Sequence, residues 1–233
     1  MAIDLNHNMT NNPPFDAFFR QWLRDQEDYL RQLLRHDGLE PRETENLLSR
    51  VLRHYESYYD EKSRFARADA LQFFSPPWLT ALEKTFLWIG GWKPSLAFRI
   101  MNSVGSLSVE QQLWMERSRA ETRVREAELA EEQAKIQESL GGPTVLEQAR
   151  RARQRARDGE RREAEEVLEA LDLAIRALLE EADLLRVDTV RKIVEILRPP
   201  QSVHFLAAAT QLHLRIRRKG LQRETGRREQ QPR

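Results

Sequence analysis

Apolar side chains recur at steps of three and four residues through most of the chain, the spacing that places them on one face of an α-helix. The clearest repeat runs from Ala164 to Leu185, and two more apolar stripes lie at 15–34 and 47–73. No alternating β-branched run flanks an Asn-Gly or Asp-Gly turn, the usual signal of a β-hairpin. The pattern therefore predicts an all-α protein, a multi-helix bundle with one long charged helix.

Proline and glycine residues mark where the predicted helices begin and end. Ser108 and Gln111 form a capping-box pattern at the start of the long charged helix, and Gly220 is expected to end the last one. The predicted helices cover about 15–36, 41–74, 78–89, 94–101, 108–140, 164–185, 190–198 and 203–219.

The helix predicted over 108–140 is rich in charged residues, and its apolar residues are sparse and small. Because such a helix cannot bury much apolar area, we expect it to project or to pack loosely unless another chain covers it. This reasoning favours a homodimer with residues 113–140 in its interface. The candidate interface positions are Leu113, Arg117, Ala120, Val124 and Ala127.

Composition divides the chain into two halves. All five Trp, all four Tyr and eight of the nine Phe lie between Phe15 and Trp114, and the apolar residues after Ala164 are mainly aliphatic. We expect the two halves to share one core in a single domain over 15–220. The polar ends, 1–14 and 221–233, are predicted to be disordered, and the arginine-rich stretch at about 143–162 is predicted to be a mobile connector.

Charge and cysteine content exclude several classes of function. Lys and Arg total 38 against 37 for Asp and Glu, so a net charge of +1 gives no overall attraction to nucleic acid or anionic lipid. The absence of cysteine excludes disulfides, thiol nucleophiles and thiolate metal sites. No apolar run approaches the roughly 18 residues that span a bilayer, and residues 1–10 lack the features of a signal peptide. We expect a soluble protein that is not secreted and does not bind membranes.

The sequence contains no recognisable catalytic or metal-binding motif. Phosphate-loop, dinucleotide, metalloprotease and serine-hydrolase patterns are all missing. The five histidines are scattered, and His204 and His213 would lie on opposite faces of one helix. We therefore predict no enzyme activity, no metal and no cofactor, and we interpret the histidines as surface or edge residues.

One dense basic patch lies in the arginine-rich stretch. It would suit phosphate contact with nucleic acid. Carboxylates surround it, however, and it has no aromatic residue for base stacking, so a solvated connector is the favoured interpretation. The candidate nucleic-acid contacts are Arg150, Arg151, Arg153, Arg155 and Arg157.

Several segments resemble the plant Delay of Germination domain. The most specific is Phe-Leu-Trp-Ile-Gly-Gly-Trp-Lys-Pro-Ser at 86–95, and 15–22, 54–62, 182–189 and 205–217 agree with it. The resemblance covers about 15–220. In the TGA basic leucine zipper transcription factors this domain follows a DNA-reading element. No basic region with leucine heptads precedes it here, so the chain resembles the stand-alone Delay of Germination-like branch.

The signature has two interpretations. Gly90 and Gly91 would let two helices approach and turn, with Trp88 beside the corner and Pro94 starting the next helix, so the motif is conspicuous because it folds the domain. The alternative is a surface that contacts a partner directly. The signature residues are Trp22, Trp78, Trp88, Gly90, Gly91, Trp92 and Pro94.

The resemblance implies a nuclear, and also cytoplasmic, regulatory protein in abscisic-acid-linked seed dormancy, maturation or development. It implies action through protein partners, either type 2C phosphatases or transcription factors. A sequence-specific DNA-binding regulator of the TGA type is the first alternative, and a helical sensor of haem or a fatty-acyl ligand is the second. No histidine pair stands ready to hold haem, so haem binding is not carried over to this chain.

Overall fold

The computed structural model describes residues 15–36, 40–74, 76–101, 104–141 and 158–230, and within these ranges the only secondary structure besides helices is one isolated β-bridge. The all-α prediction is thereby confirmed. The helices, with short 3₁₀ segments labelled η, are α1 Phe15–Leu34, α2 Pro41–Ala66, η1 Leu71–Phe73, α3 Ala81–Lys84, η2 Pro94–Leu96, α4 Ala97–Ile100, α5 Val109–Gly141, α7 Asp158–Ile196 and α8 Pro199–Gln230.

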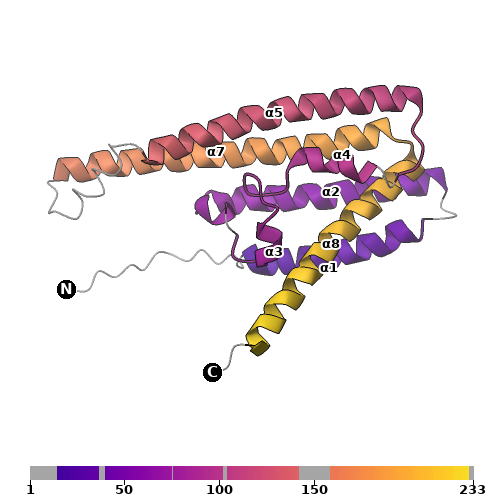
Figure 1. Ribbon diagram of the computed structural model, residues 1–233, viewed down its shortest axis with the longest axis horizontal. Helices are drawn as coiled ribbons and strands as arrows, with labels where there is room; N and C mark the ends of the chain where they lie inside the picture. Colours follow the sequence, from indigo (N-terminus) through magenta and orange to yellow (C-terminus); the bar gives the residue numbers. More distant parts are fainter. Residues whose placement is uncertain (1–14, 37–39, 75, 102–103, 142–157, 231–233) are drawn as a thin grey trace.

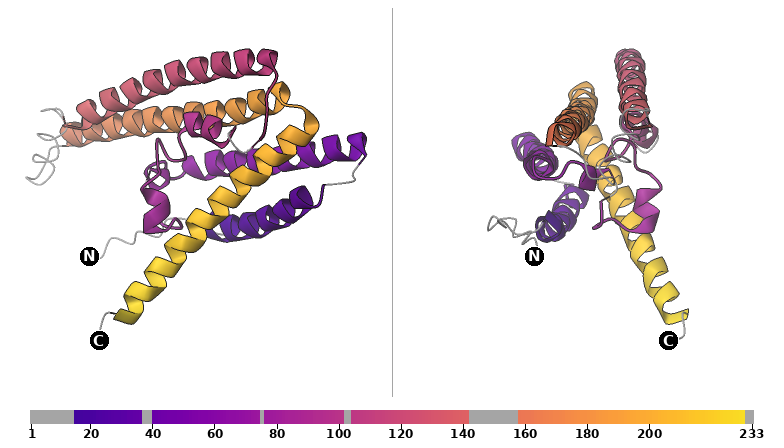
Figure 2. Two further views of the ribbon diagram at one scale, coloured as in Figure 1. Left: turned by 45° about the vertical axis from the view of Figure 1, so that its right-hand side comes forward. Right: turned by 90° about the vertical axis from the view of Figure 1, so that its left-hand side faces the viewer.

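Two antiparallel helix pairs form the bundle (Figure 1). α1 pairs with α2, α5 pairs with α7, and α2 packs against α7 to join the two layers. α8 leaves the end of α7 and crosses the bundle obliquely over α1 and α2, as both views of Figure 2 show. The short segments between α2 and α5 fill the space between the layers and contact α8 through α3.

The core consists of two clusters of buried side chains, and each combines aromatic residues of the first half with aliphatic residues of the second. Val51 and Ile193 belong to one cluster. Phe19 and Leu179 belong to the other, and Tyr55 packs against both. Both halves contribute to each cluster, but the interior has two clusters where one core was expected.

Several predicted helix limits are wrong. α2 ends at Ala66, and a turn and η1 follow where we expected the helix to continue to about Ser75. The segments predicted as separate helices at 164–185 and 190–198 form one helix, α7, because neither proline nor glycine interrupts the sequence between them. α7 begins at Asp158, inside the predicted connector. Residues 143–157 of the connector and 1–14 of the amino-terminal tail lie outside the described residues. The tail predicted to be disordered at 221–233 is helical up to Gln230, since it belongs to α8.

The long charged helix also differs from expectation, because α5 packs along α7 and does not project. Small and polar side chains, Ser118 and Thr122, are buried on the α7 side together with Met115, Leu129 and Ile136. The capping box at Ser108 and Gln111 is confirmed by its two reciprocal hydrogen bonds of 3.1 Å. The small residues let α5 pack closely against α7. This packing buries more of the surface of α5 than its composition suggested.

Gly220 does not end α8, which continues to Gln230. The glycine lies where α8 crosses α3, and a Cβ there would lie 2.1 Å from the Thr80 hydroxyl oxygen. Next to this crossing, the Arg217 guanidinium donates to the Glu83 carboxylate at 3.0 Å and to the Trp78 carbonyl at 3.1 Å. The glycine is therefore required for close contact between helices and is not a helix terminator.

We predict that Gly220→Ala lowers the free energy of unfolding by about 1 to 3 kcal/mol, because the added methyl group must displace Thr80. Gly226 lies in the same helix with open space around it, so Gly226→Ala should be neutral or should stabilise by up to about 1 kcal/mol through helix propensity. Urea unfolding of both variants measures the difference. Equal effects would show that α8 does not need close contact at Gly220.

Candidate functional site

The signature segment 88–91 forms a tight turn between short elements and not a junction of two helices. The Trp88 amide donates to the Gly91 carbonyl at 2.6 Å, and the Gly91 amide donates back at 3.1 Å. Ile89 and Gly90 have φ values of 42° and 67°, the pair of positive angles that defines a type I′ turn. Glycine at the second of these positions relieves the strain, whereas Ile89 adopts a conformation unusual for a β-branched residue.

Arg186 of α7 holds this turn from inside. Its guanidinium is 0% exposed. Nη2 donates to the carbonyl oxygens of Trp88 at 2.5 Å and Ile89 at 2.9 Å, and Nε donates to that of Trp92 at 2.7 Å. The guanidinium also lies 5.4 Å from the centre of the Trp88 ring. One side chain thus organises five consecutive residues of the signature.

Lys62 of α2 and Asp183 of α7 complete a buried charge network. Asp183 accepts from Arg186 Nη1 at 2.5 Å, and its two oxygens lie 3.0 and 2.8 Å from Lys62 Nζ. Lys62, which is 1% exposed, also donates to the Gly90 carbonyl at 2.9 Å. Burial lowers the pKa of Lys62 to about 8, although Asp183 opposes the shift. Two cations share one carboxylate here, and the backbone carbonyls of the turn supply the remaining acceptors.

The two glycines of the signature are needed because this network approaches the backbone closely. A Cβ at Gly91 would lie 2.7 Å from the Arg186 guanidinium carbon. A Cβ at Gly90 would lie 2.5 Å from the Leu179 side chain and 2.9 Å from the Phe73 carbonyl oxygen. Any side chain at either position would separate the turn from α7.

The remaining signature residues also point inward. Trp22 and Trp78 are buried, and Trp22 donates to the His54 carbonyl at 2.9 Å. Trp92 is half-buried and donates to the Tyr59 hydroxyl at 2.9 Å. Pro94, the first residue of η2, is buried, and the Trp88 ring is half-buried. The structure therefore supports the folding interpretation of the signature, since the indole donors of Trp22 and Trp92 and the carbonyls of the turn are used in contacts within the domain.

Histidines were expected at the surface, and for His54 this is wrong. Its ring stacks on Trp22 at 4.7 Å between centroids and contacts Tyr29 at 4.9 Å. Burial lowers its pKa to about 4, and Asp25 only partly opposes this. The structure also brings His36 and His204 together, 5.2 Å apart. No cluster of three or more metal-binding side chains occurs within the described ranges.

The five candidate interface positions lie together on the outer face of α5, and all five are exposed. The five arginines suggested for nucleic-acid contact, 150 to 157, fall outside the described residues. In the part of the chain that the structure describes, no helix is long and apolar enough to cross a bilayer.

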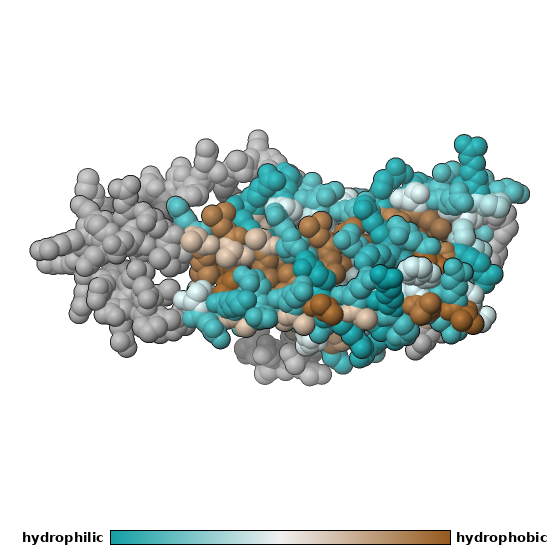
Figure 3. Space-filling view, turned by 90° about the horizontal axis from the view of Figure 1, so that it is seen from above, coloured by the Kyte–Doolittle hydropathy of each residue, from teal (hydrophilic) through white to brown (hydrophobic). Residues whose placement is uncertain are grey.

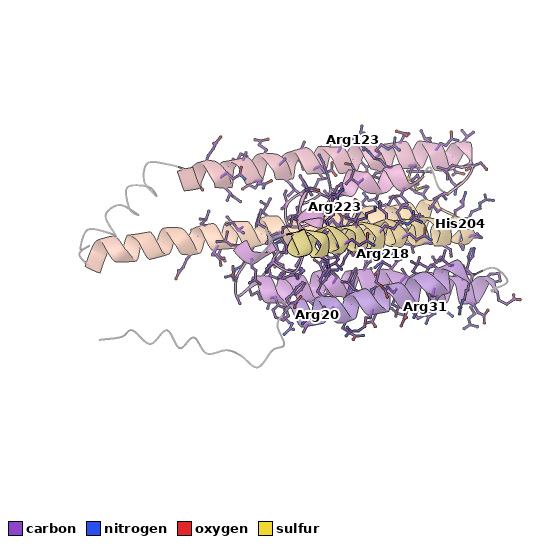
Figure 4. All side chains as sticks on the ribbon, turned by 60° about the horizontal axis from the view of Figure 1, so that its bottom comes forward. Arg20, Arg31, Arg123, His204, Arg218 and Arg223 are labelled. Atoms are coloured by element: carbon purple, nitrogen blue, oxygen red, sulfur yellow. The ribbon has the colours of Figure 1, made fainter. Side chains whose placement is uncertain are left out.

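Sequence reasoning missed a basic surface on α8. Residues 199–223 contain no Asp or Glu. The exposed cations of this stretch are without an ion pair to any described residue, and Figure 4 labels two of them, Arg218 and Arg223, beside α8. The sequence signal that could have revealed this surface is the run without acidic residues. We call the following residues the α8 basic face: Arg215, Arg218, Lys219 and Arg223.

Removal of the shared carboxylate should destabilise the domain strongly. We predict that Asp183→Asn lowers the free energy of unfolding by about 3 to 5 kcal/mol, because it leaves Lys62 and Arg186 as buried cations without a counter-charge. Asp188→Asn, an exposed change in the same helix, serves as the matched control and should have an effect below about 0.5 kcal/mol. Chemical unfolding measures the stability of both variants. A loss for Asp183→Asn as small as that of the control would show that the carbonyl oxygens of the turn are sufficient partners for Lys62 and Arg186.

His54 should make the protein sensitive to acid. Its pKa is about 4 in the folded protein and 6.5 as the ordinary value, so the unfolded chain binds the proton first as the pH falls. Stability is therefore lost between about pH 6.5 and 4, by about 2 kcal/mol between pH 7 and 4.5. His54→Phe, which keeps the aromatic stack, should remove this part of the pH dependence, while His204→Asn at the surface should not. Urea unfolding at pH 7 and pH 4.5 measures the loss of stability for each variant. An equal loss for wild type and His54→Phe would contradict the assignment of this pH dependence to His54.

Comparison with known proteins identifies close relatives. A family model described as seed dormancy control, DOG1, matches residues 26–103. The chain is 38% identical to Protein ZW2 of Arabidopsis thaliana over 91% of this chain and 98% of the relative. It is 35% identical to Protein RESPONSE TO ABA AND SALT 1 of the same plant, over 90% of this chain and 96% of the relative.

A more distant relative is the Arabidopsis transcription factor TGA1, which is 27% identical over 91% of this chain and 58% of its own length. The segment that the family model matches includes the signature turn and Lys62, whereas Asp183 and Arg186 lie beyond it. Similarity over nearly the full length of ZW2 shows that the chain belongs to the DOG1 family, the Delay of Germination family that its signature resembles.

Proposed function

We propose that this protein is a non-enzymatic regulator that binds other proteins in abscisic-acid-linked control of seed dormancy, maturation or development. Its relatives include a protein named for its response to ABA and salt, and the family model is described as seed dormancy control. The related TGA proteins are transcription factors, which supports action in the nucleus. The indole donors of Trp22 and Trp92 and the carbonyls of the signature turn are engaged within the domain, so the regulatory contact is assigned to the surface.

The observation that carries this proposal is the α8 basic face. Its cations project from one side of a rigid helix whose other side is fixed against α1 and α3. In contrast, Arg20 and Arg31 of α1 pair with Asp16 and Asp28 on their own helix. Unpaired cations on a fixed face attract an acidic surface and accelerate its binding. A partner protein with an acidic docking segment fits this face.

Apolar surface beside the cations favours a protein over DNA. Leu212 is 49% exposed on the same side of α8 as Arg215 and Lys219. The cations occupy 215–223, about 12 Å of helix at 1.5 Å per residue. A phosphate backbone would gain nothing from Leu212, whereas an amphipathic acidic segment would cover it. DNA binding of the TGA type is the second candidate, because the same cations would also attract phosphates.

Reversal of charge on the α8 basic face should remove partner binding. The test variant combines Arg215→Glu, Arg218→Glu and Lys219→Glu. Proteins retained by the immobilised chain from developing plant seed, type 2C phosphatases among them, are quantified by mass spectrometry. We expect at least a tenfold loss for the variant, because each contact changes from attraction to repulsion.

A matched control reverses three exposed cations elsewhere, with Arg31→Glu, Arg64→Glu and Lys135→Glu, whose side chains are 61%, 45% and 60% exposed. The control should keep its partners, and equal behaviour of the two triple variants would refute the assignment to α8. Titration of TGACG-containing and scrambled duplexes at near-physiological salt tests the second candidate. A preference above about tenfold, roughly 1.4 kcal/mol, would favour DNA binding instead.

A further inference from the structure

The two halves of α8 are attached to the bundle in different ways. The first half contributes three side chains that are at most 1% exposed to one of the apolar clusters: Val203, Phe205 and Leu206. In the second half, residues 210–230, the only buried apolar side chain up to residue 226 is Leu214. Figure 2 shows this second half crossing α1 and extending past it. Apolar burial therefore holds the first half more firmly than the second.

Polar groups attach the second half of α8 to its neighbours. The Thr210 hydroxyl accepts from Gln26 of α1 at 3.1 Å and lies 2.7 Å from the Tyr55 hydroxyl of α2. Further along, the Glu224 carboxylate accepts from the Ala81 amide of α3 at 2.9 Å. Opening of the segment exchanges these hydrogen bonds for bonds to water, so their net contribution to the closed form is modest.

Two histidines meet the same indole ring at this contact. His213 of the second half lies against Trp22 of α1, with 5.8 Å between the ring centres, and His54 of α2 stacks on the same ring. Burial lowers the pKa of His213, Glu83 of α3 opposes this, and Arg217 on its own helix adds to it. With the second half in place, the uncharged form of both imidazoles is therefore favoured.

Little negative charge is available to compensate a proton on either imidazole. Among the described residues, Asp25 of α1 faces His54, and Glu83 faces His213 but is already paired with Arg217 at 3.0 Å. The other titratable groups of this cluster are phenols, which are uncharged in acid: Tyr29, Tyr55 and Tyr58. A proton on either ring is therefore unfavourable until water reaches that ring.

We propose that the second half of α8 is released from α1, α2 and α3 in mild acid, while the remainder of the bundle stays folded. Release brings water to both imidazoles, so the open form binds protons that the closed form excludes. The closed form is fully favoured above about pH 6.5 and loses stability as the pH falls below it. The layer of α5 and α7, which faces the viewer in Figure 3, contains no histidine. The first half of α8 stays anchored in its apolar cluster.

Release changes the α8 basic face, because all four of its cations belong to the second half of the helix. A fixed array of cations becomes a flexible one, and an acidic partner then binds less tightly since the array must be ordered again on binding. This consequence rests on the proposed function. Release itself needs no partner, so a measurement on the isolated chain separates failure of the release from failure of the proposed function.

Spin labels test the release directly, because the chain has no cysteine of its own. Glu27→Cys on α1 and Gln222→Cys on α8, both at exposed positions, carry the labels in the full chain, and pulsed electron resonance measures their distance distribution at pH 7 and pH 5. We expect one narrow distribution at pH 7 and a broad, longer component at pH 5. The ratio of open to closed molecules should rise at least tenfold, since the pKa of His54 changes from about 4 to 6.5 on release.

A reference pair with Glu27→Cys on α1 and Glu195→Cys on α7 reports on the remainder of the bundle and should stay narrow at both pH values. An unchanged distribution between positions 27 and 222 at pH 5 would overturn the proposal. Equal broadening of both pairs would also overturn it, because the whole domain would then be unfolding.

Histidine replacement tests the cause of the release. His213→Phe and His54→Phe keep an aromatic ring against Trp22 and should each reduce the change between pH 7 and pH 5, and the double variant should remove it. His204→Asn, at an exposed position in the first half of α8, is the matched control and should respond to acid as the wild type does. If His213→Phe already opens the segment at pH 7, His54→Phe alone decides. A full acid response in His54→Phe would refute the role of these histidines.

Discussion

A guanidinium that is wholly removed from water must find all its hydrogen-bond partners inside the protein, and Arg186 imposes this constraint on the domain. Three backbone carbonyls of the signature segment and the Asp183 carboxylate supply the acceptors. The segment must therefore turn tightly, keep its carbonyls directed at α7 and carry no side chain where the guanidinium approaches. The sharp turn and Gly91 both follow from this one buried charge.

The network also connects the two layers of the bundle, in addition to the two apolar clusters. Lys62 brings α2 to the same carboxylate, so one Asp on α7 orients two helices and a turn. A second buried ion pair, between Glu83 of α3 and Arg217 of α8, fixes α8 against α3. Burial of charge in this form adds little net stability compared with an apolar core, but it penalises every arrangement in which the partners are separated. The polar contacts define which packing of the helices is allowed.

Because the interior uses the signature residues, recognition falls to outward faces of different character. The α8 basic face lies beside the exposed Leu212, and the outer face of α5 exposes Leu113 and Val124. Both faces belong to helices whose opposite sides are packed, which fixes their side chains in space.

Apolar periodicity by itself determined that the chain is helical and that both halves contribute to its core, because these depend on local spacing and on burial of whole faces. Proline residues marked where α1 and α2 begin. The capping box at Ser108 was equally local. The contacts of Lys62 and Arg186, the burial of His54 and the role of Gly220 were decided only by the tertiary structure. Each depends on residues far apart in the chain. The spacing of residues within one helix does not show which distant carbonyl, ring or hydroxyl will contact a given side chain.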